Sequence, residues 1–383
     1  MTPKMGWFID KLVMHQEYPE ANLPVVGKHG VIRHDIATNE LVSRTVSSLQ
    51  YEGSHSSTLQ IRCTGSSITV AGNPSRLNRS DNLWGYTTIE QCAQVYNQIL
   101  AEYGLPPFKR CTGKWYRQSR DGTKARVITD GAFIRHIDWT RNHTVGQGKE
   151  HSFLRGASTL TIGRGLEPRL YPNGATVDWG SHKLKVKGEG STYRYDKIYI
   201  KAEDLKTHRA KRLKHATHEE KTYYDRLIEY CQDCGIVREE QSKKAPFLKK
   251  HSTLAFYGLT TESDFAPYLT DIETAIKRLE VNHMTYETIA EQLIEKGICK
   301  STQSANATES YAYKWLHGAV IDRNKSQYHV HRSRLLELGL DIAMPHDISR
   351  LPPQIRSSEV IDFRRAVVPT WYRMPQVRQL KVA

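Results

Sequence analysis

The chain has 383 residues, which is too long for one small domain and predicts two or three domains. Its hydrophobic content of 38% is enough for a folded core. Its formal net charge of +14, spread along the chain, favours a polyanionic partner, either nucleic acid or an anionic membrane. The sequence contains no run of ~18 apolar residues and no signal-type apolar block near its start, so we expect no membrane span, a nucleic-acid partner and a cytoplasmic location.

Residues 1–260 mix strand and helix patterns and predict an α+β domain with a mixed, mainly antiparallel sheet. Apolar residues recur at helical spacing over 87–103, where Gly104 ends the predicted helix. Residues 163–190 contain several glycines and prolines and predict a loop or an irregular hairpin. The predicted strands are 6–14, 58–63, 67–71, 125–129, 132–140, 158–162, 197–205 and 236–241. The second and third of these strands are expected to form a hairpin.

The cysteines and one basic run allow more than one interpretation. Cys231 and Cys234 have the spacing of half a zinc site, but no second pair follows at a suitable distance, so we interpret them as structural. The six cysteines are scattered and predict no disulfide framework. The basic, histidine-rich run 205–221 is either a solvated helix face or a helix that contacts phosphates.

The rest of the chain has a different pattern. Residues 261–350 predict a helical domain in which a helix over 285–296, a turn at Gly297 and a second helix from 301 toward 318 have a helix-turn-helix-like layout. Gln303 and Lys314 would then contact DNA, although two purely structural helices would give the same pattern. The final segment, 351–383, interleaves arginines with aromatic residues and predicts a tail that either clamps nucleic acid or docks on the first domain.

The segment KIYIKAEDL, residues 197–205, carries the first indication of chemistry. Read as a strand, it places Tyr199, Lys201 and Glu203 on one face and apolar side chains on the other. A phenol, a cation and a carboxylate in a row suit a tyrosine that attacks a phosphodiester beside a metal ion. An ordinary amphipathic strand is the alternative.

Two other predicted strands supply further acids. The strand 132–140 places His136 and Asp138 on one face, and the strand 236–241 offers Glu240. Together with Glu203, these carboxylates could hold Mg²⁺ or Mn²⁺, with His136 as a nitrogen ligand or as the group that orients Asp138. The alternative is that the acids form ion pairs with neighbouring lysines and arginines.

With the tyrosine, the parts fit one reaction. A free tyrosine has a pKa of ~10 and is a poor nucleophile, so a cation such as Lys201 or a metal-bound phosphate would favour its phenolate. The metal would stabilise charge on the scissile phosphate, and the product would be a phosphotyrosine link to a DNA 5′ end. The residues expected to contact nucleic acid are Arg164, Arg238, Lys243, Lys249, Lys250, Gln303 and Lys314.

Several segments resemble one known family. They read RHIDWT at 135–140, TLT at 159–161, GRG at 163–165, IYIKAE at 198–203, GIVREE at 235–240, FLKK at 247–250, LLELGLDI at 335–342 and PTWY at 369–372. In these segments, and over nearly its whole length, the chain resembles the replication initiators of filamentous phages, the gene II protein family, and most of all the versions carried by Vibrio-type phages.

The resemblance implies a site-specific endonuclease and joining enzyme. Such an enzyme nicks the plus-strand origin, stays bound through a tyrosine to the 5′ end, starts rolling-circle replication and later circularises the displaced strand. It would act on single- and double-stranded origin DNA in the host cytoplasm, with host helicase and polymerase as further partners. A non-catalytic DNA-binding regulator and a plasmid-type mobilisation relaxase are the alternatives.

The resemblance also orders the candidate residues. Tyr199 ranks first as the nucleophile, followed by Tyr224 and then Tyr195, and Tyr223 or Tyr224 could serve the strand-closing step. His136 stands where the family usually has arginine. Two choices of metal ligand stay open. A bulge that shifts the strand register would make Asp204 the ligand in place of Glu203, and either Glu239 or Glu240 could face the site.

Overall fold

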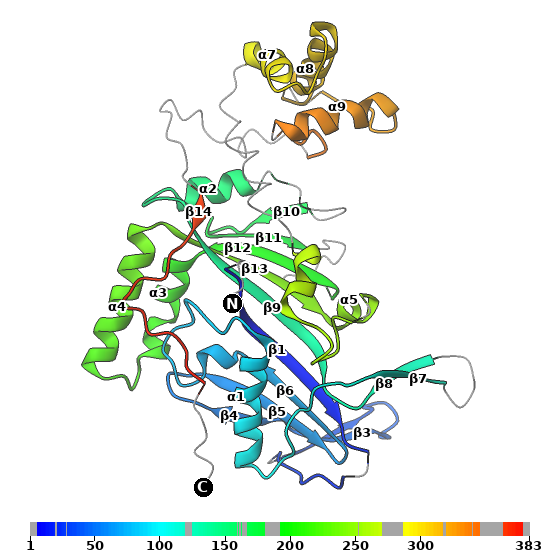
Figure 1. Cartoon of the computed structure of the whole chain (residues 1–383), viewed down its shortest axis with the longest axis vertical. Coiled ribbons are helices and arrows are strands. Elements are labelled where there is room, and N and C mark those ends of the chain that lie inside the picture. Colours follow the sequence, from blue (N-terminus) through cyan, green and yellow to red (C-terminus); the bar gives the residue numbers. More distant parts are fainter. Residues whose placement is uncertain are drawn as a thin grey trace.

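The computed structural model describes most of the chain (Figure 1). The described residues are 6–19, 21–27, 29–118, 125–158, 160, 162, 167–180, 192–251, 253–269, 286–316, 319–338, 340–344 and 363–377. Arg164 lies outside them, as does part of the predicted strand 158–162.

A large antiparallel sheet forms the body of the protein, and the α+β prediction is confirmed (Figure 1). The strand order is β10-β11-β12-β13-β9-β1-β6-β5-β4, and β14 pairs with β9 beside this path. Every described pairing in the sheet is antiparallel, so the described sheet is not mixed. The strands are β1 (Phe8–Glu17), β4 (Leu49–Glu52), β5 (Thr58–Thr64), β6 (Ser67–Gly72), β9 (Phe133–Thr144), β10 (Glu167–Leu170), β11 (Thr176–Gly180), β12 (Arg194–Ile200), β13 (Ile236–Lys244) and β14 (Arg364–Arg365).

Two small hairpins lie outside the large sheet. The first pairs β2 (Gly30–His34) with β3 (Leu41–Val46), and the second pairs β7 (Lys114–Gln118) with β8 (Ala125–Thr129). The predicted hairpin at 58–63 and 67–71 is confirmed as β5 and β6, and Gly65 adopts a positive φ of 56° in the turn between them. The segment 167–180 also forms a hairpin, β10 with β11.

Helices cover parts of the sheet. The predicted helix 87–103 is confirmed as α1 (Ile89–Glu102), which begins at a capping box formed by Thr88 and Gln91. The chain after β9 forms α2 (Glu150–Ala157), and two helices follow β12, namely α3 (Lys201–Arg212) and α4 (His218–Asp233). A short helix, α5 (Ala245–Lys250), follows β13, and 3-10 turns occur at η1 (Pro74–Arg76) and η2 (Glu262–Tyr268).

Two predicted strands are corrected. The segment 197–205 is not one strand, because β12 ends at Ile200 and Lys201 begins α3. Glu203 and Asp204 lie in the first helical turn, where acidic side chains stabilise the positive end of the helix dipole. In the segment 158–162, the described residues are not in a strand, and α2 ends just before them. Leu160 and Ile162 are buried there, so apolar packing explains the pattern.

Three apolar cores hold these elements. The first packs α1 against β1, β5, β6 and β9, and the second joins α2, α3 and α4 to β11, β12 and β13. The third belongs to the predicted C-terminal helices, which are present as α7 (Tyr286–Glu295), α8 (Thr302–Leu316) and α9 (Ser326–Glu337). Within the part of the chain that the structure describes, no helix has the length and apolar character needed to cross a membrane.

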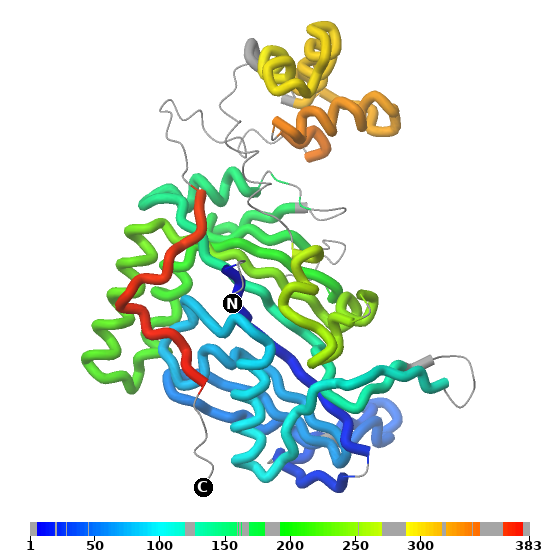
Figure 2. Tube along the Cα trace, in the orientation of Figure 1, coloured from blue at the N-terminus to red at the C-terminus, as the bar shows by residue number. Residues whose placement is uncertain are grey.

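The C-terminal segment 363–377, which we call the strap, runs along the outside of the first domain (Figure 2, red). Its strand β14 pairs with β9, and Trp371 packs edge-on against Tyr223 and Tyr230 of α4. The Tyr230 hydroxyl donates a hydrogen bond to the Val367 carbonyl at 2.7 Å. The tail was predicted either to clamp nucleic acid or to dock on the first domain, and the described part of it docks on the first domain.

The turn between α4 and β13 generates a first prediction. Gly235 has a φ of +59°, and a Cβ atom added there would lie 2.0 Å from the Gly146 carbonyl oxygen. Gly104 has a similar φ of +63° but open space around it. We expect Gly104→Ala to lower the free energy of unfolding by roughly 1–2 kcal/mol through backbone strain alone. Gly235→Ala should cost clearly more. Denaturant unfolding measures both, and equal costs would contradict the close backbone contact.

Candidate active site

Tyr199 lies near the end of β12 and points away from the apolar core. Its neighbours Ile198 and Ile200 are buried on the opposite face, as strand alternation requires. The Tyr199 hydroxyl donates a 2.6 Å hydrogen bond to Oε1 of Glu240 on the adjacent strand β13. The predicted tyrosine and one predicted acid are therefore in direct contact.

Lys197 completes this group from the same face of β12. Its Nζ lies 2.8 Å from Oε2 of Glu240 and 4.9 Å from the centre of the Tyr199 ring. Burial alone would lower the pKa of Lys197, but the Glu240 carboxylate outweighs it and raises the pKa, so the ammonium stays charged. Both oxygens of Glu240 are thus engaged, one by a phenol and one by a cation.

The neighbouring Glu239 points to the other face of the sheet. It is fully buried, and its Oε2 lies 2.6 Å from Arg141 Nε and 2.9 Å from His143 Nε2. The sequence left open whether Glu239 or Glu240 faces the site. In the structure Glu240 lies on the same face of the sheet as Tyr199, and Glu239 lies on the other face.

Burial controls the protonation of Tyr199. Desolvation, together with the negative charge of Glu240, raises the pKa of Tyr199 well above its ordinary value, although Arg238 acts in the opposite sense. The phenol is therefore neutral at rest and serves as a hydrogen-bond donor. Any reaction that needs its oxygen as a nucleophile must first move its proton, and Glu240 is the acceptor already in place.

Lys201 approaches from the first turn of α3. Its side chain is fully buried, and its Nζ lies 2.7 Å from Asp204 Oδ2 and donates to Asn82 Oδ1 at 3.2 Å. Burial and the nearby Arg238 lower the pKa of Lys201 to about 8. Its Nζ is 5.7 Å from the Tyr199 ring centre, so two lysines flank the phenol.

The first turn of α3 also separates the two acids left open by the sequence. Asp204 turns inward to Lys201, and although burial opposes its ionisation, Lys201 outweighs that effect and lowers the pKa of Asp204. Glu203 points to solvent, where its Oε1 pairs with His151 Nε2 at 2.8 Å. Helical spacing, rather than a strand bulge, brings Asp204 to the site and turns Glu203 away.

Asp10 and Asn82 belong to the site but were absent from the sequence prediction. Asp10 sits at an irregularity in β1, between the paired residues Ile9 and Lys11, and its Oδ1 accepts from Asn73 at 2.8 Å and Asn82 at 2.7 Å. Burial and Glu240 raise the pKa of Asp10. An aspartate in a strand that is mostly apolar could have marked it, by the same reasoning that singled out Asp138.

Arg238 is placed differently from its prediction as a DNA contact. It is fully buried, and its Nη2 donates to the carbonyls of Asn82 and Leu83 at 2.7 and 2.6 Å. Its Nε donates to Asn142, and its Nη1 lies 3.9 Å from Asp10 Oδ1. This guanidinium has no exposed surface to offer a phosphate, and it instead joins β13 to β1, β9 and the loop before α1.

The predicted phosphate-binding lysines divide into buried and exposed groups. Lys243 is fully buried, and its Nζ lies 3.4 Å from Asp196 Oδ1 and 3.2 Å from Gln241 Oε1, so it too is placed away from any DNA. Lys249 and Lys250 are exposed at the end of α5.

The four predicted metal ligands do not come together. On β9, His136 Nε2 lies 2.7 Å from Asp138 Oδ1, which fits His136 as the group that orients Asp138. Burial opposes ionisation of Asp138, but the bond from His136 prevails and lowers its pKa. Glu240 is engaged by Tyr199, and Glu203 lies out on α3. Among the residues that the structure describes, no three His, Cys, Asp or Glu side chains form a group that could hold a metal ion. The Mg²⁺ or Mn²⁺ site therefore stays a prediction.

The other candidate tyrosines are all engaged. Tyr224 is fully buried, donates to the Leu205 carbonyl and accepts from Arg212. Tyr223 accepts a hydrogen bond from the Arg373 backbone in the strap. Tyr195 shares the face of Tyr199, but its hydroxyl donates to Asp178 at 2.8 Å.

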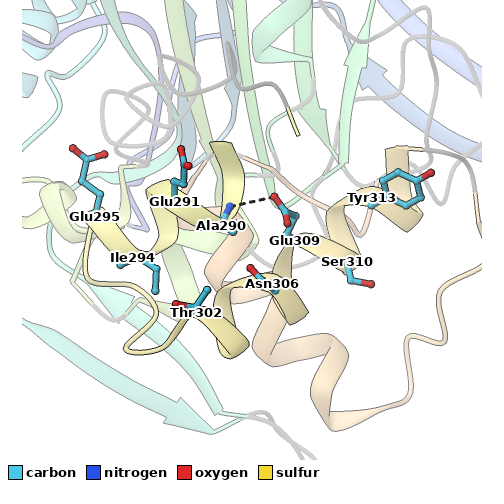
Figure 3. A pocket seen from close by; sticks show the side chains of 9 residues that line it. All are labelled: Ala290, Glu291, Ile294, Glu295, Thr302, Asn306, Glu309, Ser310 and Tyr313. Atoms are coloured by element: carbon cyan, nitrogen blue, oxygen red, sulfur yellow. Dashed lines mark hydrogen bonds between the residues drawn. The ribbon is translucent and has the colours of Figure 1, made fainter. Parts of the chain in front are cut away.

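The C-terminal helices carry a separate groove between α7 and α8 (Figure 3). The groove has a volume of about 860 Å³, and Glu291, Glu295 and Glu309 are among its lining residues. Glu309 accepts a hydrogen bond from the Ala290 backbone across it. Three carboxylates repel phosphates, so this groove is unsuited to DNA, whereas Gln303 and Lys314 are exposed on α8.

The contrast between buried and exposed cations generates a second prediction. Arg238→Met should lower the free energy of unfolding by about 3–5 kcal/mol, because it leaves buried polar partners without their cation. Lys250→Met should change stability by less than about 0.5 kcal/mol and reduce the salt dependence of DNA binding by about one charge. Denaturant unfolding and salt titrations of binding measure these effects. A stable Arg238→Met protein with weakened DNA binding would show instead that Arg238 contacts phosphate.

Comparison with known proteins agrees with the predicted family. A family model that describes the C-terminal part of the phage replication-associated protein matches residues 293–378. The replication-associated protein of Escherichia phage If1 is 37% identical over 329 residues, which cover 85% of this chain and 99% of that protein. No solved structure matches the chain. The chain therefore belongs to the replication-associated protein family of filamentous phages, the gene II protein family.

Proposed function

We propose that this protein is a replication initiator that nicks and rejoins one DNA strand at a phage origin, with Tyr199 as the nucleophile. The observation that carries the proposal is the 2.6 Å hydrogen bond from the Tyr199 hydroxyl to Glu240, with the ammonium groups of Lys197 and Lys201 4.9 and 5.7 Å from the ring centre. Membership of the replication-associated family supports the same role.

The proposed reaction balances on these side chains. The Tyr199 oxygen attacks the scissile phosphorus as its proton passes to Glu240, the bond from phosphorus to the 3′ oxygen breaks, and the leaving 3′ oxygen takes a proton from water. The 5′ phosphate is then esterified to Tyr199. The charges of Lys197 and Lys201 stabilise the developing phenolate and phosphate charge. In rejoining, a 3′ hydroxyl gives its proton to water as its oxygen attacks the phosphorus, the bond from phosphorus to the Tyr199 oxygen breaks, and Glu240 returns its proton to the departing phenol.

DNA would be held by exposed cations rather than by the buried ones. Lys249 and Lys250 lie on α5, directly after β13, the strand that carries Glu240. Gln303 and Lys314 on α8 remain predicted duplex contacts, consistent with a helix-turn-helix-like arrangement of α7 and α8. The net charge of +14 supports a polyanionic substrate of this kind.

The nucleophile assignment is tested by Tyr199→Phe. The variant keeps the ring but lacks the attacking oxygen, so we expect no covalent protein–DNA adduct with supercoiled phage DNA and unchanged DNA binding. Tyr195→Phe is the matched control, because it removes a hydroxyl from the same face of the same strand, and it should keep the adduct. Mapping the linked peptide identifies the residue. An adduct formed by Tyr199→Phe would overturn the assignment, and duplex binding without any cleavage by the unmodified protein would favour a non-catalytic regulator.

Dependence on Mg²⁺ or Mn²⁺ is a separate prediction, since the predicted ligands are not gathered in the described structure. A divalent ion, when bound, would supply charge stabilisation at the scissile phosphate. We expect chelation with EDTA to abolish nicking and added Mg²⁺ or Mn²⁺ to restore it. Undiminished nicking after exhaustive chelation would show that Lys197 and Lys201 suffice.

A further inference from the structure

The loop of residues 79–84, which we call the bridging loop, lies between the candidate active site and the strap. On its inner side, the Asn82 amide nitrogen donates to Asp10 at 2.7 Å, and the Asn82 amide oxygen accepts from Lys201 at 3.2 Å. Its backbone carbonyls at Asn82 and Leu83 accept from Arg238. One amide therefore links the acid of β1 to the lysine beside Tyr199.

On its outer side, the bridging loop is held by Tyr372 of the strap. This side chain is 7% exposed. Its hydroxyl donates to Asp81 Oδ1 at 2.7 Å and accepts from Arg79 Nη2 at 2.8 Å and from the Trp84 backbone nitrogen at 2.9 Å. The hydroxyl also lies 3.1 Å from the Trp84 carbonyl oxygen, so all of these hydrogen bonds are to the loop. The Tyr372 ring packs edge-on against Trp84, with 4.7 Å between the ring centres.

The two sets of contacts are only one residue apart in the loop. Asp81 and Trp84 are held by Tyr372, while Asn82 and Leu83, between them, contact the site. Asp81 and Asn82 are both buried. Because buried residues are closely packed, a shift of the Asp81 side chain also moves the adjacent Asn82. The position of the Asn82 amide therefore depends on the bonds that Tyr372 makes.

We propose that Tyr372 and Asn82 are positioning residues for strand cleavage, so that the C-terminal strap completes an active site carried by the first domain. Tyr372 fixes the bridging loop, and Asn82 in turn holds Lys201 and Asp10 in place beside Tyr199 and Glu240. The inference rests on the proposed nicking function and extends it to residues outside the Tyr199–Glu240 pair.

Single-turnover cleavage tests the proposal, with an oligonucleotide carrying the nick site mapped on phage DNA. Tyr372→Phe keeps the ring packing and removes the hydrogen bonds of the hydroxyl, so the maximal cleavage rate should fall roughly tenfold. The DNA concentration for half-maximal rate should stay within about twofold, since no DNA contact is lost. Tyr230→Phe is the matched control, because it removes a hydroxyl bond to the strap that does not touch the bridging loop. Its rate should match that of the unmodified protein.

A double-mutant cycle separates positioning from general stability. If Tyr372 acts through Asn82, then Tyr372→Phe combined with Asn82→Ala should cleave no more slowly than Asn82→Ala alone. Multiplied effects of the two changes would overturn the proposal, as would equal losses in Tyr372→Phe and Tyr230→Phe.

Hydrogen exchange gives a second readout that needs no cleavage and so stands apart from a failure of the nicking function. Tyr372→Phe should speed exchange of the Trp84 amide, whose acceptor is the Tyr372 hydroxyl, and of its neighbours in the bridging loop. Tyr230→Phe should leave these amides protected. Unchanged protection in Tyr372→Phe would overturn the claim that the hydroxyl fixes the loop. A Tyr199→Phe protein that still forms the adduct would overturn the nucleophile assignment alone.

Discussion

A buried charge needs hydrogen-bond and ionic partners, because burial removes it from water. The guanidinium of Arg238 is fully buried, and its partners hold several parts of the first domain together. Its hydrogen bonds reach Asn142 on β9 and two carbonyls of the loop before α1, and Asp10 on β1 lies within 3.9 Å. Each partner is drawn from a different part of the chain. These bonds fix the backbone and the side chains around Arg238. The phenol of Tyr199, the carboxylate of Glu240 and the lysines at 197 and 201 are held beside them.

The side chains on the two faces of β13 have different partners. Strands covered on both faces are usually apolar, yet six consecutive residues from Arg238 to Lys243 are polar and buried. Glu239 and Gln241 turn toward a closed network with Arg141 and His143, whereas Glu240 turns toward Tyr199. Neighbouring glutamates with similar sequence surroundings thus have unrelated partners, and only the direction of the side chain distinguishes them.

The sequence was informative where local rules decide structure, and less so where distant segments meet. The helix ending at Gly104, the β5–β6 hairpin and the strand of Tyr199 follow from periodicity and turn residues, and the Tyr199–Glu240 pair follows from strand alternation. The alternation of KIYIKAEDL continues past Ile200, where the strand ends and α3 begins, so the strand pattern misplaces Glu203. Burial of Arg238 and Lys243 could not be foreseen, since a basic residue is expected to be exposed until its partners are known. Asn82 lies in a loop without periodicity, and only the fold brings it to Lys201.

The contacts of Tyr372 span almost the whole chain, with 293 residues separating it from Arg79 and 288 from Trp84. Contacts between such distant residues form late, because the loop they close carries the largest loss of chain entropy. During synthesis the strap leaves the ribosome after every other part of the site has been made. The proposed nicking enzyme would gain from this order, since truncated or half-folded chains would carry Tyr199 and Glu240 without the strap that is proposed to complete the site.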